Sequence, residues 1–504
     1  MKNKSLLIIA LFTIQHLFSA NYFVQLGTEG AASWNETVIS AKSGILVNLN
    51  TEGKSLPAWY NATFTSNPAT AEEGHMIYII TGKYMFETPI AHKHHIHIYG
   101  GYNGNSIESR QKSEPDFWSF TNATIWDGNN NTSAFINGTG ASSGNNVIID
   151  GITLQNGLGP AVKFRTVEIL RNCKLINNKG TGKGGATLLY GGGNIQNCYF
   201  EGNSCSGTVD NGVGGDMAII GAGNRVIDGC MFISSTAENK GAVLHISGSS
   251  TTTFSNNLVR GAQTKAALYI SSTATVFPIV NIINCSFVDN TVTSIYLDVT
   301  PKVKIYNCVF WVSPDLTGGL AKVGGAADTN TIMKNCAIRE NPPASWISAD
   351  NFILESTNTG DTPNAKYPGF VNPGNNDFRI TATSSLLDAG AVFEDLPNPK
   401  DFSGTIRPQG IKPDIGYHEL TVSTAIDQIQ RAIEFRCYVK NGKMMIENKE
   451  QLATHIRIFD ITGTLIHEET FDEGETTSIV LPKGIYLINA RNAEGFRNIK
   501  TLMP

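Results

Sequence analysis

The sequence has 504 residues, a formal net charge of -5 and only 16% charged residues, against about 25% in an average globular protein. A chain without a basic run or a positive balance lacks the electrostatic footprint of nucleic-acid binding, so we expect no nucleic-acid partner. Its 50 glycines, and the Asn, Ser and Thr that recur between short apolar runs, favour many short strands joined by turns.

The first twenty residues have the pattern of a secretory signal peptide. Lys2 and Lys4 precede an apolar run over residues 6–17, which ends in Phe18-Ser19-Ala20. A basic start, a short apolar core and a small residue at the end are the parts of such a segment. We expect residues 1–20 to be removed, and an uncleaved membrane anchor is the alternative. No later apolar stretch approaches the roughly 20 residues of a membrane helix, so no transmembrane helix is expected.

Four histidines lie close together in residues 91–97, at positions 92, 94, 95 and 97. Strand alternation places His95 and His97 on one face, about 6 to 7 Å apart. This separation is too large for a shared metal ion without bending of the strand. We therefore expect a polar strand face here, with no metal and no other cofactor.

A repeat dominates the middle of the chain. Its copies follow one another at intervals of about 21 to 32 residues, which is typical of solenoids. They begin with a degenerate copy at 151–154 and continue at Asn172-Cys173-Lys174-Leu175, Asn197-Cys198-Tyr199-Phe200, Gly229-Cys230-Met231-Phe232, Asn256-Asn257-Leu258-Val259, Asn284-Cys285-Ser286-Phe287, Asn307-Cys308-Val309-Phe310 and Asn335-Cys336-Ala337-Ile338. Each copy predicts a strand in which the Cys and the apolar residue two positions later share one face.

Six of the eight cysteines occupy the same inward position of this strand, while Cys205 and Cys437 stand apart. Side chains that stack in register on neighbouring coils point the same way and do not aim at each other. We therefore expect a buried row of reduced thiols that pack as small hydrophobic groups, and disulfides between neighbouring coils are the alternative.

A second strand follows in each repeat after a polar turn, and the sequence predicts it at 186–190, 216–220, 242–246, 266–270 and 294–297. Alignment of these strands puts Leu189, Ile219, His245, Tyr269 and Tyr296 at one outward position on consecutive coils. His245, Tyr269 and Tyr296 are therefore candidate glycan contacts, with ordinary exterior stacking as the alternative. Asp216 replaces an alanine of the other coils and follows Asp210 in a Gly-rich turn. These two carboxylates are a candidate acidic site, and hydrogen-bonded turn residues are the alternative.

Several segments carry a resemblance to a known family. The segments are Met76-Ile77-Tyr78-Ile79, Ile98-Tyr99-Gly100-Gly101-Tyr102-Asn103-Gly104, Thr124-Ile125-Trp126-Asp127-Gly128, Asp377-Phe378-Arg379-Ile380, Ser384-Ser385-Leu386-Leu387-Asp388-Ala389-Gly390 and Asp414-Ile415-Gly416-Tyr417-His418-Glu419. They resemble segments of pectate-lyase-like β-helix proteins of the Bacteroidota, of the choice-of-anchor Q type. Together with the repeats, the resemblance implies an all-β chain with a right-handed parallel β-helix over residues 21–420.

The tail carries a separate resemblance. A change in composition marks a linker at residues 421–432. Beyond it, Ile456-Arg457-Ile458-Phe459-Asp460-Ile461-Thr462-Gly463 and Leu481-Pro482-Lys483-Gly484-Ile485-Tyr486-Leu487-Ile488 are similar to two strands of the type IX secretion (Por) sorting domain. Residues 433–504 are thereby expected to form a small β-sandwich that partners the type IX machinery. A β-sandwich with a general binding role is the alternative.

The functional prediction is a secreted or outer-membrane-surface solenoid that binds glycans or cell surfaces without catalysis. A lyase needs a base and usually clustered Asp residues that hold Ca²⁺, and a hydrolase needs two facing carboxylates. Neither set aligns on the outward positions, so no catalytic residue is assigned. A polysaccharide lyase or glycoside hydrolase whose site lies on loops is the alternative, and a structural surface-layer role is a third reading.

Overall fold

A computed structural model shows the protein as two compact units, over residues 1–420 and 421–504. The structure describes residues 19–503 except 69–73, 109, 113–117, 119, 139–146, 166–167, 209–210, 265, 273–276, 299–301, 314–322, 326–330, 340–350, 354–367, 394–399, 422–430, 433–434, 450–453, 463, 473 and 492–494. Nearly all of the predicted signal peptide and most of the predicted linker lie outside these residues.

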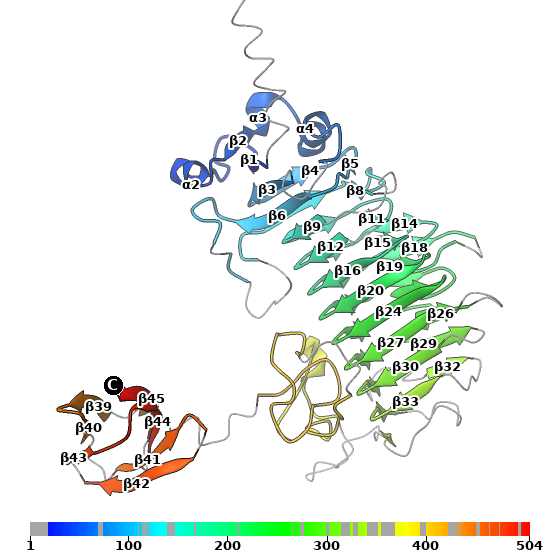
Figure 1. Ribbon diagram of the computed structural model, residues 1–504. Helices are drawn as coiled ribbons and strands as arrows, with labels where there is room; N and C mark the ends of the chain where they lie inside the picture. Colours follow the sequence, from blue (N-terminus) through cyan, green and yellow to red (C-terminus); the bar gives the residue numbers. More distant parts are fainter. Residues whose placement is uncertain are drawn as a thin grey trace, which may run out of the picture. The chain divides into compact units, whose positions relative to one another are not determined.

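Three long parallel sheets make up the first unit (Figure 1). Sheet A contains β1 (Asn21–Gln25), β2 (Ile45–Asn48), β3 (His75–Ile80), β6 (Ile96–Tyr102), β9 (Val147–Asp150), β12 (Glu168–Arg171), β16 (Gly193–Gln196), β20 (Gly223–Asp228), β24 (Ser250–Ser255), β27 (Ile279–Ile283), β30 (Lys302–Tyr306) and β33 (Ile332–Lys334). Sheet B contains β4 (Gly82–Met85), β7 (Thr124–Asp127), β10 (Ile152–Gln155), β13 (Lys174–Ile176), β17 (Tyr199–Glu201), β21 (Met231–Ile233), β25 (Leu258–Arg260), β28 (Ser286–Val288), β31 (Val309–Trp311), β34 (Ala337–Ile338) and β35 (Phe352–Ile353).

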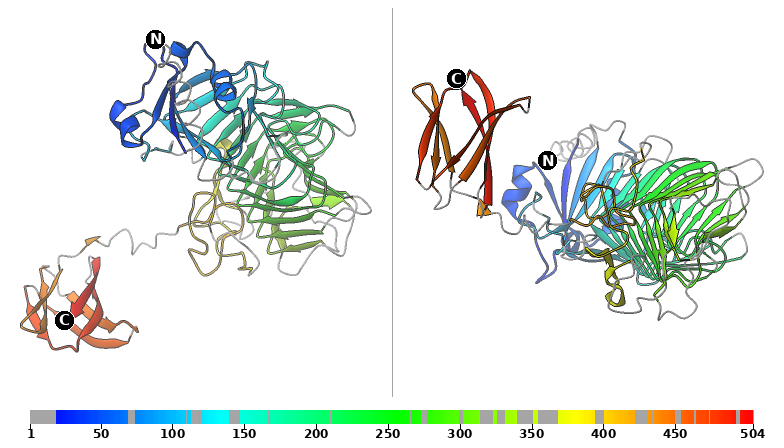
Figure 2. Two further views of the ribbon diagram at one scale, coloured as in Figure 1. Left: turned by 45° about the horizontal axis from the view of Figure 1, so that its top comes forward. Right: turned by 90° about the horizontal axis from the view of Figure 1, so that it is seen from below.

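Sheet C completes each coil. It contains β5 (Ile90–Ala91), β8 (Ile136–Asn137), β11 (Val162–Phe164), β15 (Thr187–Leu189), β19 (Met217–Ile219), β23 (Leu244–Ile246), β26 (Ala266–Ser271), β29 (Thr293–Asp298) and β32 (Val323–Gly325). The turned views of Figure 2 show the same stacking of coils. The parallel β-helix predicted from the repeats is thus confirmed. The repeats indicated sheets B and C only, because the strands of sheet A share no recurring motif.

Short helices, a minor sheet and a hairpin also belong to this unit. Near its start lie the short helices α2 (Glu36–Ala41), α3 (Leu49–Glu52) and α4 (Leu56–Thr63), which the sequence patterns did not predict. A minor parallel sheet joins β14 (Lys179–Thr181), β18 (Ser204–Ser206) and β22 (Thr236–Ala237), and a hairpin joins β36 (Phe370–Asn372) through η4 (Pro373–Asn375) to β37 (Asp377–Ile380).

The corner between sheets A and B explains the repeated asparagine. The asparagine that opens the motif adopts φ between 49° and 53° at Asn172, Asn197, Asn256, Asn284, Asn307 and Asn335, and Gly229 replaces it at φ 64°. Asn and Gly tolerate this left-handed conformation better than other residues do. The chain therefore turns sharply at each corner and directs the next residue, usually Cys, into the interior.

The predicted cysteine row is confirmed. All eight cysteines are described and free, and the six repeat cysteines are buried in the core: Cys173, Cys198, Cys230, Cys285, Cys308 and Cys336. Burial raises the pKa of the Cys173 and Cys198 thiols well above the usual value. Beside this row the phenyl rings of sheet B stack along the solenoid, with Phe287 and Phe310 centred 5.0 Å apart at 7°. In-register stacking thus gives the core its regular packing.

The described residues between 368 and 420 cover the outer face of sheet B. Phe378, Ile415 and Tyr417 are buried in one cluster with strand residues that include Trp311. A buried ion pair holds the end of the segment, with 3.0 Å between Arg407 Nη1 and Glu419 Oε2. The family-like motif residues of this segment therefore stabilise a cover over the solenoid.

The second unit has two sheets that share one core. One sheet contains β38 (Arg431–Ala432), β41 (Thr454–Asp460), β42 (Leu465–Phe471), β44 (Gly484–Arg491) and β45 (Gly495–Met503). The other contains β39 (Phe435–Lys440), β40 (Lys443–Asn448) and β43 (Thr476–Ile479). Met444 and Ile446 from the small sheet are buried in one cluster with Ile456, Ile458 and Ile488 from the large one. This arrangement matches the expected β-sandwich.

Candidate functional site

An outward row on sheet C contains the predicted aromatic residues. Strand pairing aligns Leu188, Ala218, His245, Tyr269, Tyr296 and Gly324 on consecutive coils. The predicted row was wrong at its first two members, because Leu189 and Ile219 align with Ile246 and face the core. The predicted positions of His245, Tyr269 and Tyr296 are the observed ones.

Exposure of the aromatic side chains increases from His245 to Tyr296. His245 is only 6% exposed, whereas Tyr296 is 36% exposed. The Tyr269 and Tyr296 rings stack with centroids 5.0 Å apart at 28°. On its other side Tyr296 pairs with Gly324, and a glycine adds no side chain that would cover the ring. Tyr296 is therefore the aromatic end of the stack.

Polar groups surround the tyrosine stack. The Tyr269 hydroxyl donates to Asp298 Oδ2 at 3.0 Å, and Lys240 Nζ lies 3.8 Å from the same oxygen. The Lys240 ammonium also sits 5.1 Å from the centre of the Tyr269 ring, within the range of a cation–π contact. We call Lys240, His245, Tyr269, Tyr296 and Asp298 the tyrosine platform.

His245 is a neutral member of the platform. Its Nε2 lies 3.1 Å from Ser271 Oγ, and its buried Nδ1 has no hydrogen-bond partner among the described residues. Burial, with the nearby positive charges of Lys240 and Lys183, lowers the pKa of His245 to about 3. An imidazole that stays neutral at physiological pH offers a hydrogen bond without adding charge.

The candidate acidic site lies in the interior of the coil. Asp216 is fully buried, where Asn203 Nδ2 donates to its Oδ1 at 2.9 Å and the Ser235 hydroxyl donates to its Oδ2. Burial raises the pKa of Asp216 to about 8. Asp210 lies outside the described residues. Asp216 therefore belongs to a buried polar corner that solvent does not reach.

The histidines of residues 92–97 do not form one face. His92 and His94 are buried, and burial lowers the pKa of His92 to about 4. His95 precedes β6 with φ 55°, and His97 Nδ1 accepts a hydrogen bond from the Ile148 amide at 3.2 Å. The left-handed residue at His95 breaks the alternation on which the predicted pairing of His95 with His97 depended.

The second unit was compared with known families. Residues 440–503 match the family described as the secretion system C-terminal sorting domain. The chain ends in a secretion sorting domain. This domain serves the type IX secretion system, so the protein is exported to the cell surface or the extracellular space. A search of curated proteins finds no match to the chain. No described helix is long and apolar enough to cross a membrane.

Side chains of the two sorting-domain motifs form hydrogen bonds with backbone groups near strand ends. Asp460 Oδ1 accepts hydrogen bonds from the Thr462 amide at 2.8 Å and from the Thr464 amide at 3.0 Å, which closes the turn after β41. The Tyr486 hydroxyl donates to the Pro482 carbonyl at 3.0 Å. Both motif blocks therefore fix the backbone of the sorting domain at strand ends.

The sequence patterns did not predict Lys240 and Asp298, the charged residues of the tyrosine platform. Lys240 lies in the turn before β23, and Asp298 lies at the end of β29. Neither residue belongs to a recurring motif. The only available signal was the spacing of Asp298, two residues after Tyr296 on the same strand face.

Proposed function

We propose that this protein is a secreted or cell-surface β-helix that binds glycans through the tyrosine platform without catalysing their breakdown. Export by the sorting domain provides the location, and residues 1–20 serve as the signal peptide that takes the chain out of the cytoplasm. The β-helix is of the pectate-lyase-like, choice-of-anchor Q type.

The observation that carries the proposal is the exposed Tyr296 ring at the end of an aromatic stack, with a charged pair beside it. Tyrosine combines an apolar ring with a polar tip, which suits ligands that are part apolar and part hydroxylated. A sugar ring presents C–H groups on its face and hydroxyl groups on its rim. Its face fits the Tyr296 ring, and its hydroxyls fit the Lys240 ammonium and the Asp298 carboxylate.

Replacement of Tyr296 by alanine tests the proposal. The change removes the stacking surface at an exposed position, so the fold should persist. We expect Tyr296→Ala to weaken binding on a glycan array by about tenfold, which corresponds to roughly 1.4 kcal/mol. The matched control is Tyr190→Ala, because Tyr190 is 38% exposed and lies outside the platform.

The same polysaccharides should be assayed for new reducing ends and for the ultraviolet absorbance of unsaturated uronides. Binding that is equal in Tyr296→Ala and in the wild type would refute the platform as the binding site. Formation of either product by the purified protein would refute the non-catalytic proposal in favour of a hydrolase or a lyase.

A further inference from the structure

Two cavities, which we together call the groove, lie at the corner between sheets A and B and beside it on sheet B. Residues that are distant in the sequence meet there: the repeat corners, Lys112 and Trp118, and Phe402. Trp118 Nε1 donates to the Gly229 carbonyl at 2.9 Å. Its indole stacks on Phe402, with centroids 5.6 Å apart at 16°.

The two cavities flank Phe402, which lines both of them. The first has a volume of about 260 Å³ and the second about 380 Å³. Sites for drug-sized molecules usually measure roughly 300–1,000 Å³. The first cavity is smaller than this range and the second lies near its lower end, so each suits a single ring. Lys112, Asn172, Asn197, Asp228, Lys400 and Asp401 line the first cavity. Trp118, Asn372, Asn376, Asp377, Arg379 and Tyr417 line the second.

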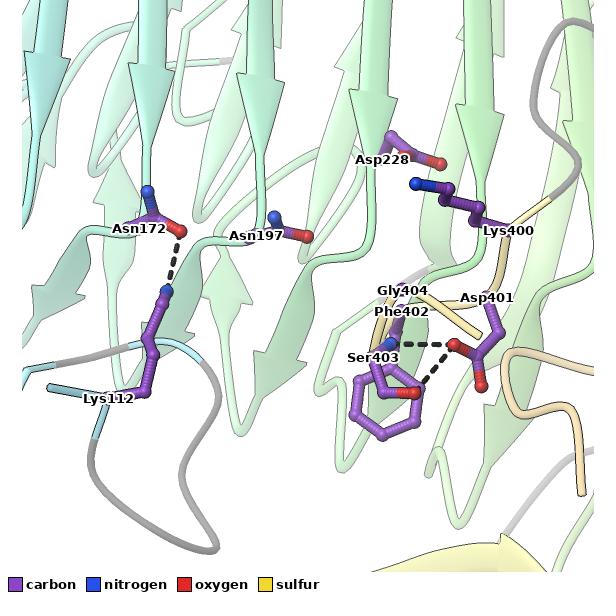
Figure 3. A pocket seen from close by; sticks show the side chains of 9 residues that line it. All are labelled: Lys112, Asn172, Asn197, Asp228, Lys400, Asp401, Phe402, Ser403 and Gly404. Carbon is purple, nitrogen blue, oxygen red and sulfur yellow. Dashed lines mark hydrogen bonds between the residues drawn. The ribbon is translucent and has the colours of Figure 1, made fainter. Parts of the chain in front are cut away.

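Amides and balanced charges line the first cavity (Figure 3). Lys112 Nζ donates to Asn172 Oδ1 at 2.6 Å, and Figure 3 shows the Lys400 side chain pointing toward Asp228. Asn197 lies between these two pairs in the same view, with an exposed side chain. Its amide occupies the space over the next corner, Gly229, where an added Cβ would lie 2.5 Å from Asn197 Oδ1.

The second cavity repeats this chemistry above an aromatic floor. Arg379 binds Asp377 through two contacts, Nε to Oδ1 at 2.8 Å and Nη2 to Oδ2 at 2.6 Å. Asn376 is exposed beside this pair with φ 65°. The cation in this cavity is therefore balanced by a carboxylate. In the first cavity Lys400 points toward Asp228, and Lys112 interacts electrostatically with Asp150.

This lining selects a class of ligand. An anionic ligand gains little from cations that already face carboxylates. An apolar ligand would cover the exposed amides of Asn197 and Asn376 without offering them hydrogen bonds, which is costly. Hydroxyl groups both donate and accept, as the Asn amides do, and the face of a sugar ring fits an aromatic surface. A neutral saccharide meets all of these conditions.

We propose that the groove around Phe402 binds a neutral saccharide, with one sugar ring in each cavity. The site shares the ligand class of the proposed function but lies on a different corner of the coil. It can therefore be tested separately from the tyrosine platform.

Glycine replacements of asparagine provide the test, because they remove an amide and keep the left-handed turn. We expect Asn197→Gly and Asn376→Gly each to weaken binding of a neutral hexasaccharide by about fivefold, the effect of one uncharged hydrogen bond. The probes are cellohexaose, xylohexaose and mannohexaose, titrated calorimetrically into the full chain, with hexagalacturonate as the charged comparison. The matched control is Asn335→Gly, at the same corner position with φ 49° but outside the groove.

Weaker binding in both groove variants, with wild-type affinity in Asn335→Gly, supports the groove whatever the affinity of Tyr296→Ala. Wild-type affinity in Asn197→Gly and Asn376→Gly overturns it, and so does failure of all three neutral probes to bind. Binding of hexagalacturonate alone overturns the neutral class. A loss confined to Tyr296→Ala upholds the tyrosine platform and refutes the groove, so the two proposals can fail independently.

Discussion

The carboxyl group of Asp216 is enclosed in the core of a coil, and this burial makes the stability of the protein depend on pH. Because burial raises the pKa of Asp216 from 3.8 to about 8, the native state holds a proton that the unfolded state releases at a lower pH. The stability that Asp216 contributes is therefore full below pH 4 and declines as the pH rises toward 8.

Asp216→Asn should remove this dependence, because an amide can accept from Asn203 and donate to Ser235 in the same place. We expect the variant to gain stability over the wild type as the pH rises from 5 to 8, by up to about 1.4 kcal/mol per pH unit. Calorimetric unfolding of both proteins across this range measures the difference. The control is Asp298→Asn, which removes a partly exposed carboxylate. Wild-type and Asp216→Asn curves that stay parallel with pH would contradict the buried, protonated state.

The positions of some residues could be predicted from the sequence, and those of others could not. The inward cysteines could be predicted because Cys and the apolar residue two positions later recur with the same spacing. The outward row failed at Leu189 and Ile219 because its first coils have apolar residues at both candidate positions, Leu188 with Leu189 and Ala218 with Ile219. Alternation carries no information where both faces are apolar.

At the scale of elements, the corners between sheets A and B depend on a left-handed residue, which is asparagine at six motif copies and glycine at Gly229. Asn335 is such a corner, with φ 49°. We expect Asn335→Ala to destabilise the β-helix by about 1 kcal/mol, because an L residue with a Cβ pays a steric cost in this conformation. Asn335→Gly should stay close to the wild type. The midpoint of thermal unfolding compares the two variants.

Equal losses in Asn335→Ala and Asn335→Gly would show that the amide, and not the backbone conformation, matters at this corner. Equal stability of all three proteins would show that the corner carries no conformational strain. Either result would contradict the left-handed turn as the reason for the repeated asparagine.

Elements were predictable where they repeated. Most strands of sheets B and C in the middle of the chain follow recurring motifs, whereas the strands of sheet A, such as Glu168–Arg171, share only a short apolar alternation. Such short runs fit several structures equally well. The helices over residues 36–63 lie before the first copy of the strand motif, so the spacing of the repeats carried no information about them.

At the scale of the whole molecule, the β-helix and the sorting domain that follows it could be predicted, but the candidate sites could not be assembled. The sorting domain was recognisable because two motif blocks occur in order near the end of the chain. The groove escaped prediction because Trp118, Gly229 and Phe402 are separated by more than a hundred residues each. Only the folded chain brings the loop, the corner and the end segment together.

The central claim is that a β-helix which folds by itself is exported by the sorting domain. Deletion of residues 433–504 in the native host, followed by cell fractionation, tests it most directly. A fusion of the same residues to an unrelated secreted reporter is the control for the sorting signal. We expect the truncated β-helix to be stable, to be retained in the periplasm and to be lost from the cell surface and the medium. Surface or medium levels of the truncated protein equal to those of the full chain would contradict the claim.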